Sequence, residues 1–275
     1  MSARAVPTGP WTAALPMYDL PELRGATDAW WSGIARHLRA AGVAGVPERL
    51  TRPRAVAAVW DDPDLLLGQG CGYPFTQAYA DRWQYLATPV YAVPGCDGPA
   101  YRSWLVVAEA APVTAVADLL GTTAAVNGAT SHSGWIALLA ALADHAPPGG
   151  RPLGQVVWTG GHRASLRAVA DGQADIAAVD CVTHALLAAH APQALAGTRV
   201  LAGTPAAPGL PLIAGENVDR DTRRRVRAAL HAAVADPALA AARRALRLDG
   251  LRVLPPDAYA RIGALAAAGG AAPTD

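Results

Sequence analysis

Short apolar runs alternate along this chain with longer stretches in which apolar residues recur at every third or fourth position. The short runs, such as 65–68, are typical of buried strands, and the periodic stretches are typical of amphipathic helices. In 27–41, for example, Trp30, Ile34 and Leu38 would share one face of a helix. The near-regular alternation of the two patterns predicts an α/β protein with mixed, mostly parallel sheets flanked by helices.

The pattern sets approximate bounds for each element. The expected strands are 13–17, 65–68, 86–93, 104–108, 122–127, 155–158, 175–179, 199–202 and 210–214. The expected helices are 27–41, 53–60, 116–120, 134–144, 164–171, 181–190, 221–246 and 256–267. The glycine-rich stretch 70–74 is interpreted as a turn.

The chain length favours two lobes. At 275 residues the chain reaches the size at which single cores commonly divide. Pro- and Gly-rich stretches interrupt the alternation in two places, which we interpret as hinge crossings near 91–99 and 203–216. We therefore expect a discontinuous first lobe, 1–94 and 216–275, and a second lobe, 95–215, with a ligand cleft between them.

Two polar turns follow predicted strands and precede predicted helices. The first is Ser131-His132-Ser133-Gly134, and the second is Thr159-Gly160-Gly161-His162. Hydroxyls and backbone N–H groups at a helix N-terminus form a site for an anion, and a glycine would let the ligand approach. Since ligands of open α/β sheets bind beyond the carboxyl ends of strands, these turns predict a binding cleft for a small polar ligand.

The candidate ligand-binding residues all lie at or just after predicted strand ends: Tyr18, Tyr73, Ser131, His132, Ser133, Thr159, His162 and Asp180. Each has a structural alternative. The serines and Asp180 could cap helices, and His132 could be a solvent-facing loop residue. The residues around Thr159 could form a local capping network, and the tyrosines could be core residues. Ser131 and His162 could act as nucleophile and base only if the fold brought them together.

The net charge and the absence of known motifs argue against several classes of function. With 23 basic and 22 acidic residues and a net charge of +1, the chain lacks the basic excess of a nucleic-acid-binding protein. All basic side chains apart from histidine are arginines, and the arginine-rich stretch 220–227 is interpreted as a solvated helix face. The sequence contains no P-loop, dinucleotide fingerprint, nucleophile elbow or zinc-protease motif.

The cysteines and the N-terminal residues give expectations about metal sites, disulfides and location. Cys71, Cys96 and Cys181 are odd in number and have no metal-ligand spacing, so we expect buried apolar thiols, with no metal site, cofactor or disulfide framework. The first ten residues have no apolar export segment and no lipid-attachment cysteine. A complete chain would therefore be cytoplasmic, whereas a trimmed or missed signal would place it in the periplasm or at the cell surface.

Taken in order, several segments resemble one family. They are Leu15-Pro16-Met17-Tyr18-Asp19, Gly68-Gln69-Gly70-Cys71-Gly72-Tyr73-Pro74, the two polar turns, and Gly172 to Asp180. Over about 13–215 the chain is similar to the phosphate, phosphite and phosphonate-binding proteins of ABC importers. Members of that family commonly carry threonine between the two serines, where this chain has His132.

The resemblance implies a type II periplasmic-binding-protein fold, in which two α/β lobes close over an anionic ligand without catalysis. It places Ser131, His132 and Ser133 at the phosphonyl-binding turn, and Tyr18, Tyr73, His162 and Asp180 along the cleft. The expected protein is a monomer that binds a small phosphonate, phosphate or similar oxyanion and serves an ABC transporter permease. The alternatives are an enzyme on the same fold acting on a small carboxylated metabolite, and a cytoplasmic ligand-sensing module.

Overall fold

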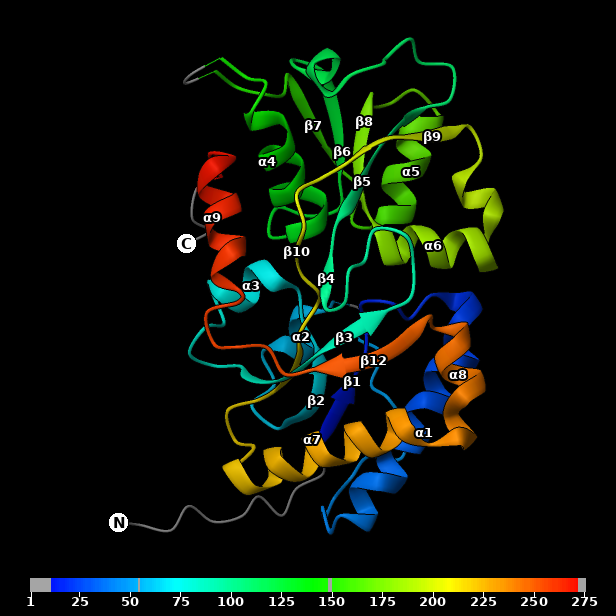
Figure 1. Cartoon of the computed structure of the whole chain (residues 1–275), viewed down its shortest axis with the longest axis vertical. Coiled ribbons are helices and arrows are strands. Elements are labelled where there is room, and N and C mark those ends of the chain that lie inside the picture. Colours follow the sequence, from blue (N-terminus) through cyan, green and yellow to red (C-terminus); the bar gives the residue numbers. More distant parts are fainter. Residues whose placement is uncertain (1–10, 54, 148–149, 272–275) are drawn as a thin grey trace. The chain divides into compact units, whose positions relative to one another are not determined.

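The computed structural model describes residues 11–53, 55–147 and 150–271 (Figure 1). Part of the expected helix 53–60 lies outside the described residues. So does part of 147–152, whose prolines and glycines predict a linker between the helix 134–144 and the strand 155–158. The N-terminal segment 1–10 lies entirely outside them. The described residues group into two compact units. The first contains 11–70, 79–89 and 210–253, and the second contains 71–78, 90–209 and 254–271.

The first unit is built on a five-stranded mixed sheet in the order β1-β2-β11-β3-β12. Its strands are β1 (Thr12–Ala14), β2 (Leu65–Gln69), β3 (Gln84–Tyr91), β11 (Leu212–Ala214) and β12 (Leu248–Arg252). Strands β1 and β2 are parallel, and β11 runs antiparallel to both of its neighbours. The accompanying helices are η1 (Pro21–Leu23), α1 (Arg24–Ala40), α2 (Ala57–Trp60), α7 (Arg220–Ala235), η5 (Pro237–Leu239) and α8 (Ala240–Ala245).

The second unit is built on another five-stranded mixed sheet, in the order β7-β6-β8-β5-β9. Its strands are β5 (Ser103–Ala108), β6 (Thr123–Val126), β7 (Gln155–Trp158), β8 (Ile176–Asp180) and β9 (Thr198–Gly203). Strands β6, β7 and β8 are parallel, whereas β5 is antiparallel to β8 and β9. A short antiparallel ribbon pairs β4 (Ala100–Tyr101) with β10 (Ala207–Pro208).

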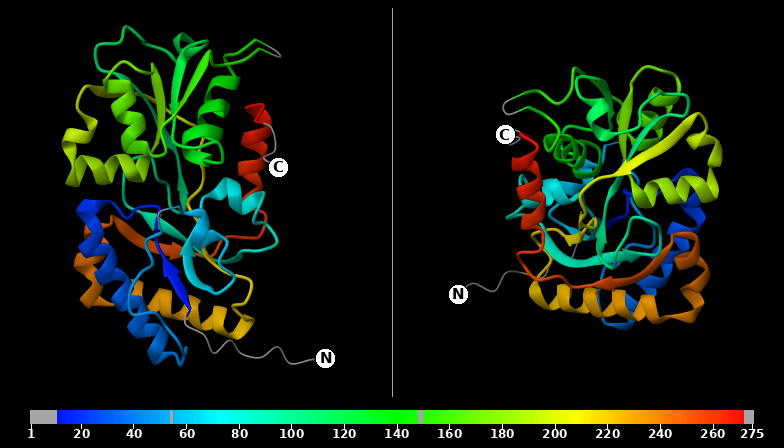
Figure 2. Two further views of the ribbon diagram at one scale, coloured as in Figure 1. Left: turned by 180° about the vertical axis from the view of Figure 1, so that it is seen from behind. Right: turned by 45° about the horizontal axis from the view of Figure 1, so that its top comes forward.

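Helices flank this second sheet, as Figure 2 shows. They are α3 (Gly72–Thr76), η2 (Val116–Leu119), the π-helical turn η3 (His132–Ile136), α4 (Ala137–Ala143), α5 (His162–Ala170), α6 (Cys181–His190), η4 (Pro192–Leu195) and α9 (Ala260–Ala268). Alternate residues of the central strands, such as Leu105, Val126 and Ile176, form a buried core with Leu138 and Leu142 of α4. Each sheet is therefore mixed and flanked by helices, and the predicted α/β class is confirmed.

Two expected elements differ in the structure. The stretch 70–74 is not a simple turn, because α3 begins at Gly72, with Pro74 in the first helical turn, where its missing N–H costs nothing. The expected helix 221–246 is broken between α7 and η5, because Pro237 disfavours a helical conformation for Asp236. Strand β12 was not expected at all, since Gly250 interrupts its apolar pattern.

The units also differ from the expected lobes by a few residues near the crossings, where 90–94 belong to the second unit and 210–215 to the first, and at two further segments. Residues 71–78 and 254–271 group with the second unit, although both were expected in the first lobe. The physical cause is the packing of α3 against α9 and the residue just before it. The ring of Phe75 meets that of Tyr259 edge-on at 4.9 Å, and Gly72 lies so close to Ile262 that a Cβ atom would not fit.

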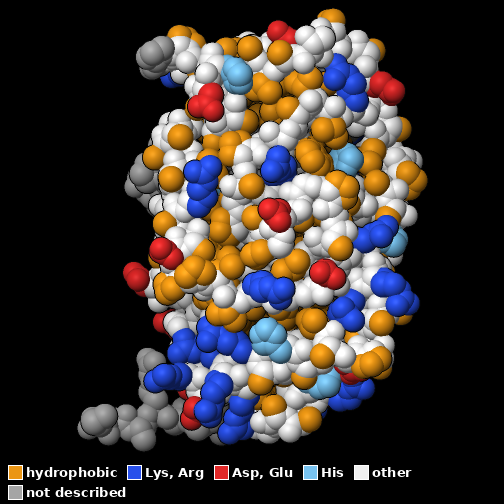
Figure 3. Space-filling view, in the orientation of Figure 1, with side chains coloured by type: hydrophobic (Ala, Val, Ile, Leu, Met, Phe, Trp, Pro, Cys, Tyr) orange, Lys and Arg blue, Asp and Glu red, His pale blue; other side chains and the backbone are white. Residues whose placement is uncertain are grey.

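The arginines of α7 are only partly a solvated face. Figure 3 shows basic side chains gathered at the level of α7, and Arg220, Arg224 and Arg225 are exposed. Arg227 is half-buried, however, and donates to the backbone oxygens of Leu86 (2.9 Å) and Tyr85 (2.6 Å). The expectation of a fully solvated run is therefore wrong, because part of the run attaches α7 to β3.

Candidate functional site

The serine turn lies between β6 and α4 in the second unit. Ser131 is the N-cap: its Oγ accepts a hydrogen bond from the Gly134 amide (3.0 Å), and its carbonyl accepts from Trp135 and Ile136 (both 3.1 Å). The helix begins at His132 rather than at Gly134, as a π-helical turn in which the Ala137 amide donates to the His132 carbonyl. The turn is therefore both a helix cap, as the alternative interpretation predicted, and an array of hydroxyls at a helix start.

Gly134 accommodates a protein side chain. A Cβ atom at this position would collide with Oδ1 of Asn127, which follows β6. We expected the glycine to let a ligand approach, and in the structure it makes room for the Asn127 amide. Asn127 was missed from the sequence because nothing in the turn itself indicates which side chain lies beside the glycine.

The structure joins the two polar turns through Ser133. Its Oγ lies 3.0 Å from Nε2 of His162, the first residue of α5, and 3.4 Å from Oγ of Ser131. The Ser133 carbonyl accepts a hydrogen bond from Ser103 Oγ (2.8 Å). The partner of His162 is therefore Ser133, whereas the sequence had raised a pairing with Ser131.

Two buried polar atoms near this turn, Asn127 Oδ1 and His132 Nδ1, have no hydrogen-bond partner among the described residues. His162 Nδ1 makes no hydrogen bond of good geometry with any described residue, although the Ala178 backbone interacts with this imidazole. The other two such atoms, in Trp31 and Arg243, belong to the first unit. Buried polar groups are nearly always hydrogen-bonded, because leaving one unsatisfied costs about 1–3 kcal/mol. The second unit therefore concentrates its unsatisfied groups at the serine turn.

The two histidines of the polar turns are uncharged at neutral pH. Burial lowers the pKa of both His132 and His162 to about 4, so both imidazoles are neutral and each ring offers one N–H donor. Tyr101, whose ring centre lies 5.9 Å from that of His132, is also buried, and burial raises the pKa of its phenol well above 10. Neutral hydroxyl and imidazole groups thus surround Ser133, and the carboxylate of Asp180 is close enough to raise the pKa of Tyr101 and of Cys71.

Thr159 belongs to a local capping network. Its hydroxyl lies 2.6 Å from Ser165 Oγ and 3.1 Å from the Val126 carbonyl, which fixes the loop before α5. Thr159 also lines an open groove of about 830 Å³ with Arg163 and Arg167. The hydroxyl is thus engaged within the protein, as the capping alternative predicted.

Asp180 ends β8 and caps α6. Its Oδ1 accepts a hydrogen bond from the Thr183 amide (2.8 Å), and the residue is only 2% exposed. The capping role considered from the sequence is therefore confirmed for Asp180. The prediction that its carboxylate also contacts a ligand stays a prediction.

The two tyrosine candidates lie in different units. Tyr73 is buried in α3 of the second unit, next to Gly72 and close to Cys71, whose sulfur accepts a hydrogen bond from the His132 amide (3.3 Å). Tyr18 is buried in the first unit, in the bend after β1. Their roles as ligand contacts stay predictions.

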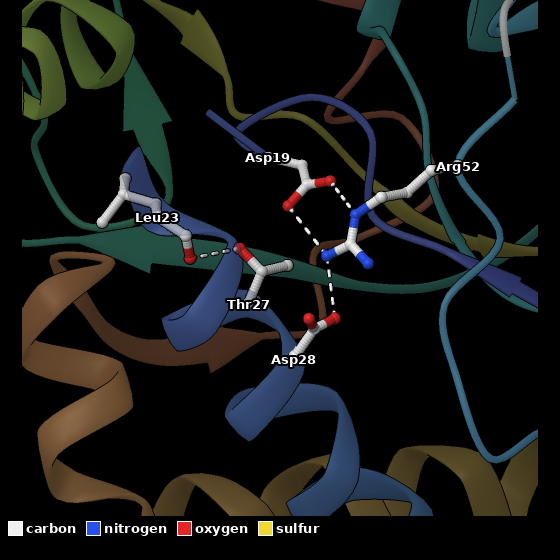
Figure 4. Close-up of polar contacts among 5 residues, drawn as sticks. All are labelled: Asp19, Leu23, Thr27, Asp28 and Arg52. Carbon is white, nitrogen blue, oxygen red and sulfur yellow. Dashed lines mark hydrogen bonds and ion pairs between the residues drawn. The ribbon is translucent and has the colours of Figure 1, made fainter. Parts of the chain in front are cut away.

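An ion-pair cluster fixes the bend that carries Tyr18. Figure 4 shows Arg52 between two carboxylates: it donates to Asp19 through Nε (2.5 Å) and Nη2 (3.2 Å), and to Asp28 through Nη2 (2.8 Å). Hydrogen bonding to Asp19 raises the pKa of Arg52 further above its usual value. The neighbouring hydroxyl of Thr27 donates to the Leu23 carbonyl and so holds the start of α1.

Neither a metal-binding cluster nor a membrane-spanning helix occurs among the described residues. No group of three or more His, Cys, Asp or Glu side chains in 11–53, 55–147 and 150–271 could hold a metal ion. No helix within those same ranges has the length and apolar character needed to cross a bilayer.

Two mixed α/β units, each with helices on its sheet, define the class of type II periplasmic binding proteins, and solved structures agree. A binding protein component of an ABC phosphonate transporter from Pseudomonas aeruginosa aligns with a TM-score of 0.73 at 16% identity, covering 93% of this chain and 85% of that one. PhnD1 from Prochlorococcus marinus, in complex with methylphosphonate, aligns with a TM-score of 0.72 at 13% identity, covering 94% and 97%. A protein from Xanthomonas citri bound to chloride ion gives 0.71 at 18% identity, covering 94% and 97%.

The chain belongs to the family of phosphonate-binding periplasmic substrate-binding proteins of ABC transporters, whose model matches residues 64–259. The resemblance seen in the sequence is thereby confirmed, as are the fold class and the solute-binding role. No curated protein sequence matches the chain. The family is periplasmic, which supports the second of the two expected locations and not the cytoplasmic one.

Proposed function

We propose that this protein, located outside the cytoplasm, binds a small phosphonate or phosphate-like oxyanion at the serine turn. It then delivers the oxyanion to the permease of an ABC importer. The observation that carries the proposal is the buried His132 imidazole, whose Nδ1 has no hydrogen-bond partner among the described residues and which lies in the same turn as the hydroxyls of Ser131 and Ser133. An oxyanion with several acceptor oxygens would give an N–H group of His132 and the two hydroxyls a common partner.

Within this proposal the serine hydroxyls and the Ser133 amide bind the oxyanion. The first amides of a helix have no partner within it, and the His132 and Gly134 amides already donate to Cys71 and Ser131. The Ser133 amide, between them, is the one we assign to the ligand. Neutral donors suffice because hydrogen bonds to a charged acceptor are about twice as strong as neutral ones and strengthen where water is excluded.

The proposed class of ligand rests on the family and on one of the similar solved structures. The family is described as phosphonate-binding, and PhnD1 from Prochlorococcus marinus was solved with methylphosphonate. We therefore assign this chain a tetrahedral phosphorus oxyanion in preference to a planar carboxylate. Thr159 and Asp180 support the site by fixing the starts of α5 and α6.

Isothermal titration calorimetry with methylphosphonate, phosphate, phosphite, methanesulfonate and acetate tests the proposal. We expect tight binding of at least one phosphorus oxyanion, weakened about 10-fold for each hydroxyl removed in Ser131→Ala and Ser133→Ala. Ser32→Ala, at an exposed serine of α1, is the matched control and should bind like the wild type. If none of the phosphorus compounds binds, or if the double serine variant binds with unchanged Kd, the proposal is wrong.

One observation favours an enzyme instead, namely the 3.0 Å contact between Ser133 Oγ and His162 Nε2, which resembles a nucleophile with its base. Two features weigh against it. The pKa of His162 is lowered to about 4, which makes a poor base, and its imidazole interacts with the Ala178 backbone instead of with the carboxylate that orients a catalytic histidine. Incubation with methylphosphonate and a phosphonate ester, followed by ³¹P NMR, separates the two functions: new signals dependent on Ser133 would indicate an enzyme.

A further inference from the structure

Two of the three cysteines lie together in the second unit. The sulfur atoms of Cys96 and Cys181 are 3.7 Å apart, although 85 residues separate them in sequence. Cys181 is the first residue of α6, directly after Asp180, and Cys96 lies in the turn before β4. Closing this gap to a bond of about 2 Å requires only a small movement of the two side chains.

Backbone hydrogen bonds hold both cysteines near one short segment. The Cys96 amide donates to Val93 O (3.1 Å), and Asp97 and Ala100 exchange two hydrogen bonds of 3.0 Å that close the turn. The Cys181 amide donates to Arg102 O (3.1 Å). The sulfur contact thus joins two anchored backbones: that of Cys96, in the turn before β4, and that of Cys181, which is hydrogen-bonded to the residue after β4.

Gly95 makes the close approach possible. Its φ is +95°, in the left-handed region, and a Cβ atom here would lie 2.8 Å from Cβ and 3.1 Å from Sγ of Cys181. It would also lie 2.8 Å from the ring of Trp104. Any other residue at this position would push the turn away from α6, so the backbone itself is shaped to keep the two sulfurs adjacent.

The two thiols differ in accessibility. Cys96 is half-buried and Cys181 is buried. The contact with Cys96, followed by burial, raises the pKa of Cys181, and the nearby Asp180 adds to the effect. Cys181 therefore stays protonated at neutral pH, and an oxidant in solution meets Cys96 first.

We propose that Cys96 and Cys181 form a disulfide by exchange with an external disulfide-bearing oxidant. The Cys96 thiolate attacks one sulfur of the oxidant, and the first oxidant thiolate leaves as a mixed disulfide forms. Cys181 loses its proton, attacks Sγ of Cys96 and displaces the second oxidant thiolate. The two cysteine thiols lose two electrons and two protons, and the oxidant disulfide becomes two thiols.

The bond ties the 93–100 turn to the start of α6. It fixes the residue next to Asp180, whose side chain caps the same helix. The periplasm is a compartment in which such bonds form and persist. Cys71, whose sulfur accepts the His132 amide, has no part in the exchange and remains a thiol. The proposed disulfide is separate from ligand binding, and its test does not depend on whether the protein binds an oxyanion.

Peptide mapping tests the bond directly. Each cysteine falls in its own tryptic peptide, since trypsin cuts this lysine-free chain to give 55–82, 83–102 and 168–199. The folded, reduced protein is incubated with oxidised glutathione, denatured, alkylated and digested. We expect 83–102 linked to 168–199, lighter by two hydrogens, with only 55–82 alkylated. Any of three results would overturn the proposal. These are alkylation of all three peptides, stable glutathione adducts without a disulfide between peptides, and a disulfide that involves 55–82.

Thermal unfolding gives a second readout. Oxidation should raise the Tm of the wild type by about 5 °C, reversibly on addition of dithiothreitol, because a crosslink over a long loop constrains the unfolded chain. Cys96→Ser should abolish the redox dependence of Tm, and Cys71→Ser, the matched control, should retain it. The same redox-dependent shift of Tm in Cys96→Ser would contradict a disulfide between Cys96 and Cys181. If a variant does not fold, the peptide map of the wild type tests the disulfide by itself.

Discussion

Ser133 is held from three directions, and this defines the site at the scale of single residues. Ser103 Oγ fixes its carbonyl (2.8 Å), and His162 Nε2 (3.0 Å) and Ser131 Oγ (3.4 Å) flank its hydroxyl. Ser103 is only 1% exposed, so its hydrogen bond is shielded from water. The hydroxyl that we assign to the ligand is therefore pre-oriented, which lowers the entropy lost on binding.

The contact between Gly134 and Asn127 yields a prediction about stability. Gly134→Ala places a methyl group against Asn127 Oδ1, so the buried amide must move. We expect a loss of about 1–3 kcal/mol in the free energy of unfolding, as for other overpacked interiors. Urea denaturation followed by tryptophan fluorescence measures it.

A double-mutant cycle provides the control. Asn127→Ala removes the atoms that the new methyl group meets, so the double variant should recover most of the loss caused by Gly134→Ala alone. Additive effects of the two substitutions would show that the alanine acts through the helix backbone, contrary to this explanation.

How far the sequence revealed the site depends on the distance between its parts. Ser131, His132 and Ser133 could be predicted together because one turn at a strand end contains all three. Asn127 and the pairing of His162 with Ser133 could not, because each depends on the position of a separate backbone segment. Periodicity indicates which face of an element is buried and says nothing of which distant side chain meets it.

At the scale of elements, Arg227 attaches α7 to β3. Its guanidinium donates to two backbone oxygens, of Leu86 and Tyr85, and the side chain is half-buried. Arg227→Ala should lower the free energy of unfolding by about 1–3 kcal/mol, since both carbonyls lose a charged donor. Arg224→Ala, at an exposed position paired only with Asp221 (3.3 Å), should change it by less than about 1 kcal/mol. Equal effects in denaturant unfolding would rule out a specific role for the Arg227 hydrogen bonds.

The predicted bounds of an element agree best with the structure where a local feature of the sequence determines where the element begins or ends. Strand β7 and helix α6 have the expected bounds, because a strongly apolar run and a capping Asp180 determine them locally. Strand β12, with Gly250 in its middle, forms because β3 lies beside it in the sheet. Tertiary packing overrides local propensity in that case.

At the scale of the whole molecule, buried histidines couple folding to pH. Burial lowers the pKa of His132 from 6.5 to about 4, and the residue is only 2% exposed. Between these two values the unfolded chain binds a proton that the folded chain does not. Protonation therefore favours the unfolded state, and the stability that the neutral His132 provides is complete above pH 6.5 and lost as pH falls towards 4.

We therefore expect the free energy of unfolding to fall by up to about 3 kcal/mol for His132 alone between pH 6.5 and pH 4, measured by urea denaturation at each pH. His132→Gln removes one titrating group and should make this part of the profile less steep. The remaining slope comes from His162 and His184, because burial lowers the pKa of both. His145→Gln, at an exposed histidine, should leave the profile unchanged. Carboxylates whose pKa is lowered in the fold, such as Asp219, lose their contribution only below about pH 4, so their effect falls outside the window. An equally steep decline in His132→Gln would show that other groups destabilise the protein in acid.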